Sequence, residues 1–185
     1  MAKIYINFDK KSISNAIKQI QQVKKTLQNE TTTVFLTRCL NWIRTRANEY
    51  LDMFNIDQRT ISDIKSNWEA NVVGNVGTLI NKSYKAVFVE FGVGAIGATS
   101  PHPNAPHENY EYNVPSDKKD RDGKWRFKVD EDYGVDLIAG YYSKKENTIT
   151  TSGSPSTLYL YNAMMDLISS GIYKTLWKEA LKQTI

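Results

Sequence analysis

Cysteine, histidine and long apolar runs are scarce in this sequence of 185 residues. Cys39 is the only cysteine, so the chain cannot form an internal disulfide, and a reducing compartment suits it. His102 and His107 are the only histidines, which leaves few bases for catalysis. No apolar run approaches the roughly 20 residues of a membrane helix, and no apolar segment follows the basic start MAKIYINFDKK. We therefore expect a soluble protein with no membrane contact and no classical export.

The composition is that of an ordinary globular protein, because 41% of residues are hydrophobic and 24% are charged. This length is enough for one well-buried core, so we expect a single domain over residues 1–185. The net charge of +4 permits a nucleic-acid neighbour but does not require one.

Apolar residues at helical spacing predict two N-terminal helices, separated by the polar segment Asn29–Thr33. Asp9 or Ser12 can cap the first helix. Its apolar stripe consists of Ile13, Ile17, Ile20, Val23 and Leu27. The second stripe consists of Leu36, Leu40, Ile43, Ala47, Tyr50, Leu51 and Phe54.

Ile56–Asp63 is expected to be a turn region, followed by a hairpin of Ile64–Val73 and Asn75–Asn81. The most apolar stretch, Lys82–Gly97, comes next. Within it Tyr84–Phe91 suits a short helix or a buried strand, with a slight preference for the helix. Glu90 lies inside this apolar run and therefore needs a partner or an interface.

A long insertion is expected at about residues 98–151, because it is rich in proline and charge. Within it Lys124–Val129 alternates like a strand. Ser154 and Pro155 can then open the last helical region, which Gly171 either kinks or divides.

These elements predict an α+β fold with a small, largely antiparallel sheet built from Ile64–Asn81 and Lys124–Val129. The helix pair at Asp9–Phe54 and the C-terminal helix at Ser154–Leu181 are expected to pack on one face of that sheet.

Candidate chemistry is sparse. Gly92–Gly97 spells the GxGxxG of a dinucleotide loop, but the proline-rich segment after it does not suit a helix, and a glycine loop is favoured. His102, His107 and Glu108 are close in sequence but lack a third strong metal ligand and a shared helix face. The acids Asp130, Glu131, Asp132 and Asp136 lie beside the basic residues Lys124, Arg126 and Lys128, and this mixed charge favours a solvated hairpin over a catalytic site. We expect no enzyme activity, no cofactor and no bound metal.

Two short motifs carry a resemblance to a known family. The first is Ser83-Tyr84-Lys-Ala86-Val-Phe-Val89-Glu90-Phe91-Gly92, and the second is the turn around Gly153 and Pro155 that leads into Tyr161-Asn-Ala163. In outline, from Ile13 to about Leu181, the chain resembles the neck or tail-completion proteins that join head to tail in long-tailed double-stranded-DNA bacteriophages.

The resemblance implies a structural virion protein that forms a homo-oligomeric ring around the DNA channel. Its partners would be the adjoining head-completion or adaptor protein, the tail-terminator protein, and double-stranded DNA passing through without sequence readout. It would lie in the virion neck, and in the host cytoplasm during assembly. The alternative is a nucleic-acid-binding regulator of phage or prophage origin.

Candidate interface residues follow from the surplus of aromatic and apolar side chains, which one small core cannot bury. They are Phe35, Trp42, Phe88, Glu90, Phe91, Trp125, Phe127 and Trp177. Candidate residues facing a DNA channel are Lys18, Lys24 and Lys25.

Overall fold

A computed structural model describes residues 10–99, 102–103, 124–128, 140–143, 146, 148–151 and 153–184. The described chain is mixed helix and sheet, which confirms the predicted α+β class. Its contacts form two compact units. Unit 1 comprises Met1–Arg44, Ala70–Ile80 and Met164–Ile185, and unit 2 comprises Thr45–Glu69 and Asn81–Ala163. Residues 1–9 lie outside the described residues, as do His107 and the acidic residues 130–136.

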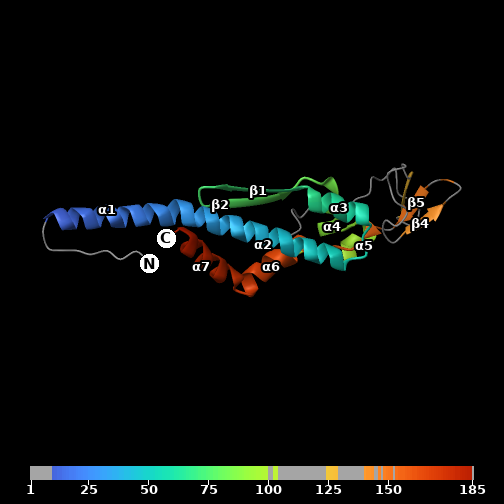
Figure 1. Ribbon diagram of the computed structural model, residues 1–185. Coiled ribbons are helices and arrows are strands. Elements are labelled where there is room, and N and C mark those ends of the chain that lie inside the picture. Colours follow the sequence, from blue (N-terminus) through green and yellow to red (C-terminus); the bar gives the residue numbers. More distant parts are fainter. Residues whose placement is uncertain are drawn as a thin grey trace. The chain divides into compact units, whose positions relative to one another are not determined.

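The N-terminal helices are continuous, so the predicted pair is in fact one long helix (Figure 1). α1 (Lys10–Thr26) passes through a π-helical segment, η1 (Leu27–Thr31), directly into α2 (Thr32–Met53). The residues on both sides of η1 keep right-handed helical backbone angles. The polar residues that suggested a break are accommodated by one wider turn, in which the Thr32 hydroxyl donates to the Leu27 carbonyl at 3.1 Å.

The predicted turn at Ile56–Asp63 is wrong, because this segment lies largely in helix α3 (Gln58–Ser66). Asp57 caps this helix by accepting a hydrogen bond from the Thr60 amide at 2.9 Å. Ile61 and Ile64 are buried together on one face. Their β-branched shape favours a strand locally, but the cap and the shared buried face outweigh that preference.

The hairpin is confirmed over a shorter range, as β1 (Trp68–Val73) and β2 (Val76–Asn81). Gly74 has φ +59° in the two-residue turn, a conformation that favours glycine. In unit 1 the hairpin lies directly on α2, since a Cβ at Gly77 would lie 3.3–3.5 Å from the side chains of Leu36 and Leu40.

The predicted strand in the insertion is also confirmed, as β3 (Trp125–Lys128). It does not join the hairpin, so the expectation of one shared sheet is wrong. β3 pairs antiparallel with β5 (Thr148–Thr151), which also pairs antiparallel with β4 (Gly140–Ser143). This second sheet has the order β3-β5-β4.

Tyr84–Phe91 is helical and forms α4. The glycine segment after it contains a short helix, α5 (Gly94–Thr99), where a glycine loop was expected. The two-residue strand β6 (Gly153–Ser154) is bridged to Val93.

Gly171, at φ +70°, separates two C-terminal helices, α6 (Tyr159–Ser169) and α7 (Ile172–Thr184). In unit 1 the end of α7 is fixed beside the π-helical segment, because the hydroxyls of Thr31 and Thr184 lie 2.5 Å apart. Phe35 and Trp177 meet edge to face at 5.2 Å, and Arg38 forms an ion pair with Glu179 at 2.9 Å.

Candidate functional site

Glu90 is a buried acid in unit 2 whose carboxylate has several hydrogen-bond partners. It lies in the last turn of α4, and only 5% of its surface is exposed. A carboxylate buried to this extent is costly unless it is paired and hydrogen-bonded. The sequence predicted that Glu90 needs a partner or an interface, and the structure provides partners within the chain.

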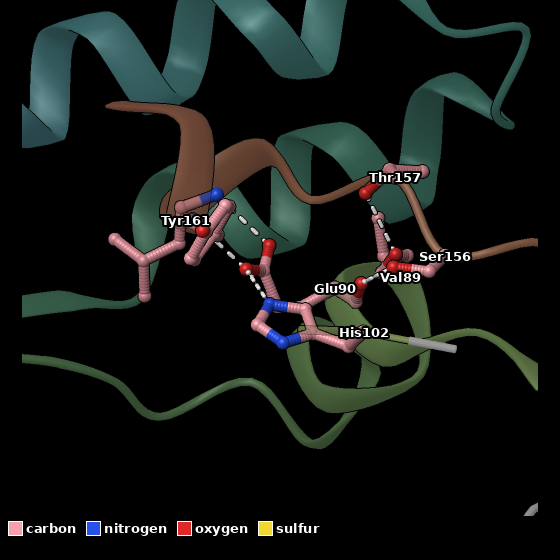
Figure 2. Close-up of polar contacts among 7 residues, drawn as sticks. Val89, Glu90, His102, Ser156, Thr157 and Tyr161 are labelled. Carbon is pink, nitrogen blue, oxygen red and sulfur yellow. Dashed lines mark hydrogen bonds and ion pairs between the residues drawn. The ribbon is translucent and has the colours of Figure 1, made fainter. Parts of the chain in front are cut away.

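The carboxylate of Glu90 caps the N-terminus of α6 (Figure 2). Its Oε2 accepts a hydrogen bond from the Leu160 amide at 2.8 Å, and its Oε1 accepts one from the Tyr161 amide at 2.9 Å. The first amides of a helix have no partner within the helix, and the helix dipole favours a negative charge beside them. Glu90 thus does for α6 what a local cap residue does elsewhere.

The same junction caps the C-terminal end of α4 in return. Its last carbonyls lack partners in the helix, and the segment before α6 provides donors for them. The Ser156 hydroxyl donates to the Glu90 carbonyl at 2.6 Å. The Thr157 hydroxyl and amide donate to the Val89 carbonyl at 2.7 and 3.1 Å (Figure 2). Glu90 of α4 thus accepts from the first amides of α6, and the segment before α6 donates to the last carbonyls of α4.

His102 completes the environment of the carboxylate. Its Nε2 lies 2.9 Å from Glu90 Oε1, and both side chains are buried. The imidazole ring lies 4.4 Å from the ring of Phe91 and 5.3 Å from that of Tyr161, between centroids. His102 is therefore a buried partner of Glu90. We call the set Glu90, His102, Ser156, Thr157 and the amides of Leu160 and Tyr161 the Glu90 clasp.

Two backbone features show how closely the clasp is packed. Gly92, at φ +75°, ends α4, and a Cβ there would lie 2.6–2.8 Å from backbone atoms of Ser154, Pro155 and Ser156. Leu158 adopts φ 55°, a left-handed conformation that costs a non-glycine residue roughly 1–2 kcal/mol. Its amide donates to the Glu90 carbonyl at 3.3 Å.

Tyr159 lies beside the clasp with 1% of its surface exposed, and its ring lies 6.3 Å from that of Trp68. Burial, together with the negative charge of Glu90, raises the pKa of the Tyr159 hydroxyl above its ordinary value. The side chains of Tyr159 and Glu90 are thus both buried at this junction. Its geometry is suited to joining two helices.

The predicted opening of the last helix at Ser154 and Pro155 is wrong. α6 begins at Tyr159, and its capping oxygens come from Glu90, about 70 residues earlier in the chain. Local sequence contains no signal for that distant cap. The available clue was an unpaired acid within an apolar run.

The predicted interface residues lie in different places. Phe35 and Trp177 contact each other in unit 1, and Trp42 is half-buried. Phe88 is 47% exposed on α4, next to Tyr84 and Val87. Glu90 and Phe91 belong to the clasp and its surroundings. Trp125 and Phe127 lie in β3, and the structure describes only their backbone.

Lys18, Lys24 and Lys25 are exposed on α1, but they do not share one face. At 3.6 residues per turn, Lys18 and Lys25 fall on one line with Lys11, on the side away from Ile13 and Ile20. Lys24 falls beside the isoleucines.

Within the described residues no group of histidine, cysteine or acidic side chains is arranged to hold a metal. Among the helices of that part of the chain, none combines the length and apolar character needed to cross a membrane. Comparison of the chain with protein-family models, curated proteins and solved structures finds no match.

Proposed function

We propose that this chain is a structural protein of the neck of a long-tailed double-stranded-DNA bacteriophage. Its copies would form a ring that joins the DNA-filled head to the tail and surrounds the DNA channel. The chain would act without enzymatic chemistry, beside a head-completion or adaptor protein and a tail-terminator protein.

The Glu90 clasp is the observation that carries this proposal. The resemblance rests on two motifs, Ser83–Gly92 and the turn from Thr151 to Ala163, which are about 60 residues apart in the chain. In the structure these motifs contact each other, and their characteristic residues make the contacts. The glutamate of the first motif caps the helix that begins within the second, and the hydroxyls of the second cap the helix of the first. Because Gly92 of the first motif has no side chain, the backbone of the second motif can pass close to it.

This use of the motif residues supports an assembly role. Residues that serve a reaction are expected to face a cavity, whereas these maintain a joint between two helices. Several elements also present large apolar side chains to solvent, among them α1, the hairpin, α4 and α6. Exposed apolar faces of this kind mark contacts with other protein chains.

Inactivating the gene in the phage or prophage genome that carries it tests the proposal. Electron microscopy of the lysate is expected to show filled heads and complete tails that remain unjoined, and a plasmid copy of the gene should restore joined particles. Normal particles from the inactivated genome would overturn the neck role.

A nucleic-acid-binding regulator is the second candidate, and the row Lys11, Lys18 and Lys25 on α1 favours it. Seven-residue spacing places these charges about 10 Å apart along one line of the helix, a pattern that can follow phosphates. A regulator would bind short duplexes as an isolated chain, with an affinity that falls steeply as salt rises. Retarded migration of a short duplex at physiological salt would favour this candidate.

A further inference from the structure

The π-helical segment η1 adds one residue to the long helix formed by α1 and α2. It occupies Leu27–Thr31, and the residues that flank it keep right-handed helical backbone angles. A π turn joins residues five apart, whereas an α turn joins residues four apart, so one π turn contains one residue more. Each residue turns an α-helix by about 100°. Compared with an unbroken α-helix, η1 therefore rotates α1 by about 100° about its axis.

One line of residues after η1 faces α7. Thr31, Phe35 and Arg38 follow one another at intervals of four and three residues, and each of them contacts a side chain of α7. We call these three residues the α7 line. Leu36 and Leu40 lie on another side of the helix, under the hairpin. The start of α2 is therefore held on two sides within unit 1.

The isoleucines of α1 would continue the α7 line if the helix were unbroken. Ile20, Ile17 and Ile13 precede Thr31 by 11, 14 and 18 residues, which are about three, four and five turns of an α-helix. The extra residue in η1 instead places these three side chains, the α1 stripe, about 100° away from the α7 line. They are 42–52% exposed there. The spacing of the side chains thus fits an unbroken helix, and the observed helix changes phase at η1.

Contacts with the end of α7 stabilise η1. Thr31 is fully buried, and its hydroxyl is hydrogen-bonded to that of Thr184, which donates to the Ala180 carbonyl at 3.0 Å. Within the turn, the Thr32 hydroxyl donates to the Leu27 carbonyl at 3.1 Å, across five residues. A π turn is rare compared with an α turn, so its persistence depends on neighbouring groups of this kind.

We propose that η1 is a two-state switch of helix phase that the end of α7 controls. While Thr184 is bound to Thr31, the π turn persists and the α1 stripe lies off the α7 line. When the end of α7 leaves, the extra residue joins the α-helical register, and α1 rotates by about 100° about its axis. The isoleucines then continue the line of Phe35, which the departing helix has uncovered. The change converts an interrupted apolar line into one continuous seam from Ile13 to Phe35.

Such a switch couples a contact at the end of the last helix to the surface of the first. Both states keep the contacts of Leu36 and Leu40 with the hairpin, since only α1 turns. The coupling needs one element with two discrete arrangements, and η1 provides it. It is a property of the single chain and does not rest on the neck role.

Paired histidines report the phase of the helix, because two imidazoles chelate Ni²⁺ only when they lie on the same side of neighbouring turns. Side chains five residues apart meet this condition across a π turn but lie about 140° apart in an α-helix. The test variant carries Lys25→His and Glu30→His, two exposed positions with most of η1 between them. The matched control carries Gln19→His and Lys24→His, with the same spacing inside α1. Calorimetric titration is expected to show about tenfold tighter Ni²⁺ binding by the test variant.

Releasing the end of α7 should remove this difference. Thr184→Glu places a charge against the buried Thr31 hydroxyl, so the end of α7 is expected to leave. Added to the test variant, it should lower the Ni²⁺ affinity about tenfold, to that of the control pair. Thr184→Ser keeps the hydroxyl and should leave the affinity unchanged. Thr184 is the last residue of α7, so far-UV circular dichroism should show the parent's helix content in both.

The coupling is reciprocal, so a second measurement needs no change in α7. Ni²⁺ bound by the test variant favours the π turn and therefore the docked end of α7. Amide hydrogen exchange in the last turn of α7 should slow by up to about tenfold when Ni²⁺ is added. The same addition to the control variant should leave the exchange unchanged.

Equal Ni²⁺ affinities for the two histidine pairs would overturn the proposal, because the π turn would then be absent in solution. An affinity that Thr184→Glu leaves unchanged, or exchange in α7 that Ni²⁺ does not slow, would also overturn it, because the end of α7 would not control the turn. None of these results bears on the neck role, which is tested separately by the unjoined heads and tails.

Discussion

Glu90 shows how one residue can determine the arrangement of two helices. An unpaired buried carboxylate costs several kcal/mol, yet here the oxygens accept from two helix amides and lie against an imidazole. Hydrogen bonds to a charged acceptor contribute about 1.5–3 kcal/mol each, which is enough to offset much of the desolvation. The position therefore requires a carboxylate.

Replacing Glu90 by glutamine tests this requirement. The amide group of Glu90→Gln places an N–H donor opposite one of the amides of Leu160 and Tyr161, so one donor is left without an acceptor. We expect the unfolding free energy to fall by about 2–3 kcal/mol in urea titration. Glu69→Gln, at an exposed ion pair with Lys82, is the matched control and should change it by less than about 1 kcal/mol. Equal effects would show that the clasp is not a stabilising feature.

The raised pKa of Tyr159 predicts that the protein becomes less stable at alkaline pH. Its pKa is raised in the folded state, first by burial and then by the charge of Glu90, so the folded chain keeps a proton that the unfolded chain releases. The stabilisation is present below the ordinary pKa of 10.0 and is lost as pH rises above it. We expect the unfolding free energy to decrease above pH 10 by up to about 1.4 kcal/mol per pH unit. Tyr159→Phe should remove that part of the slope, and an unchanged slope would contradict the assignment.

The sequence predicted that Glu90 needs a partner, since an acid in an apolar run is informative by itself. It did not predict which partner. The amides of Leu160 and Tyr161 lack acceptors within the helix only because α6 starts at Tyr159, and the sequence did not predict that start. His102 was missed for a related reason. A histidine between prolines resembles a loop residue until its contact with Glu90 is known.

At the scale of elements, the crossing of α4 and the segment before α6 depends on Gly92. Gly92→Ala should destabilise the protein by about 3 kcal/mol or more, because its Cβ would overlap backbone atoms that cannot move independently. Gly171→Ala is a close control, since Gly171 has a similar φ of +70° but nothing within 4 Å of the added Cβ. Only the conformational cost of about 1–2 kcal/mol applies there. Thermal unfolding of both variants distinguishes crowding from backbone strain.

The long helix is expected to be core in one part and surface in another. Leu40 is 7% exposed beneath the hairpin, so Leu40→Ala should lower the unfolding free energy by about 2–4 kcal/mol. Ile20→Ala, on the same continuous helix but 52% exposed, should change it by less than about 1 kcal/mol. A large loss at Ile20 would mean that the α1 stripe is already buried in the single chain.

Element prediction succeeded where periodicity was sustained and failed where it was short. The stripe that includes Leu40, Ala47 and Leu51 correctly marked the buried side of α2. The nine residues of α3 contain too many β-branched side chains for local preference to indicate a helix. Asn29–Thr33 indicated a break because polar runs usually end helices, whereas a π-helical turn can accommodate them.

At the scale of the whole molecule, the mixed helix and sheet class was predictable from the sequence, but the division of strands between two sheets was not. Short alternating segments specify a strand without specifying its neighbour, and β3 pairs with β5, in which Thr148 is the partner of Lys128 and Thr151 that of Trp125. The chain forms two compact units, and the single domain expected from the sequence stays a prediction. The ring, its neighbours and the channel are proposals that particle-level evidence must test.

The most direct measurement is the position of this chain in purified virions. A small epitope tag after Thr184, in a genome whose particles remain infective, allows gold-labelled antibody to mark the protein under the electron microscope. We predict label at the junction between head and tail. The separated heads and tails from the inactivated genome should carry no label. Absence of the chain from purified particles, with the protein recovered on DNA in the infected cell, would contradict the neck role and favour the regulator.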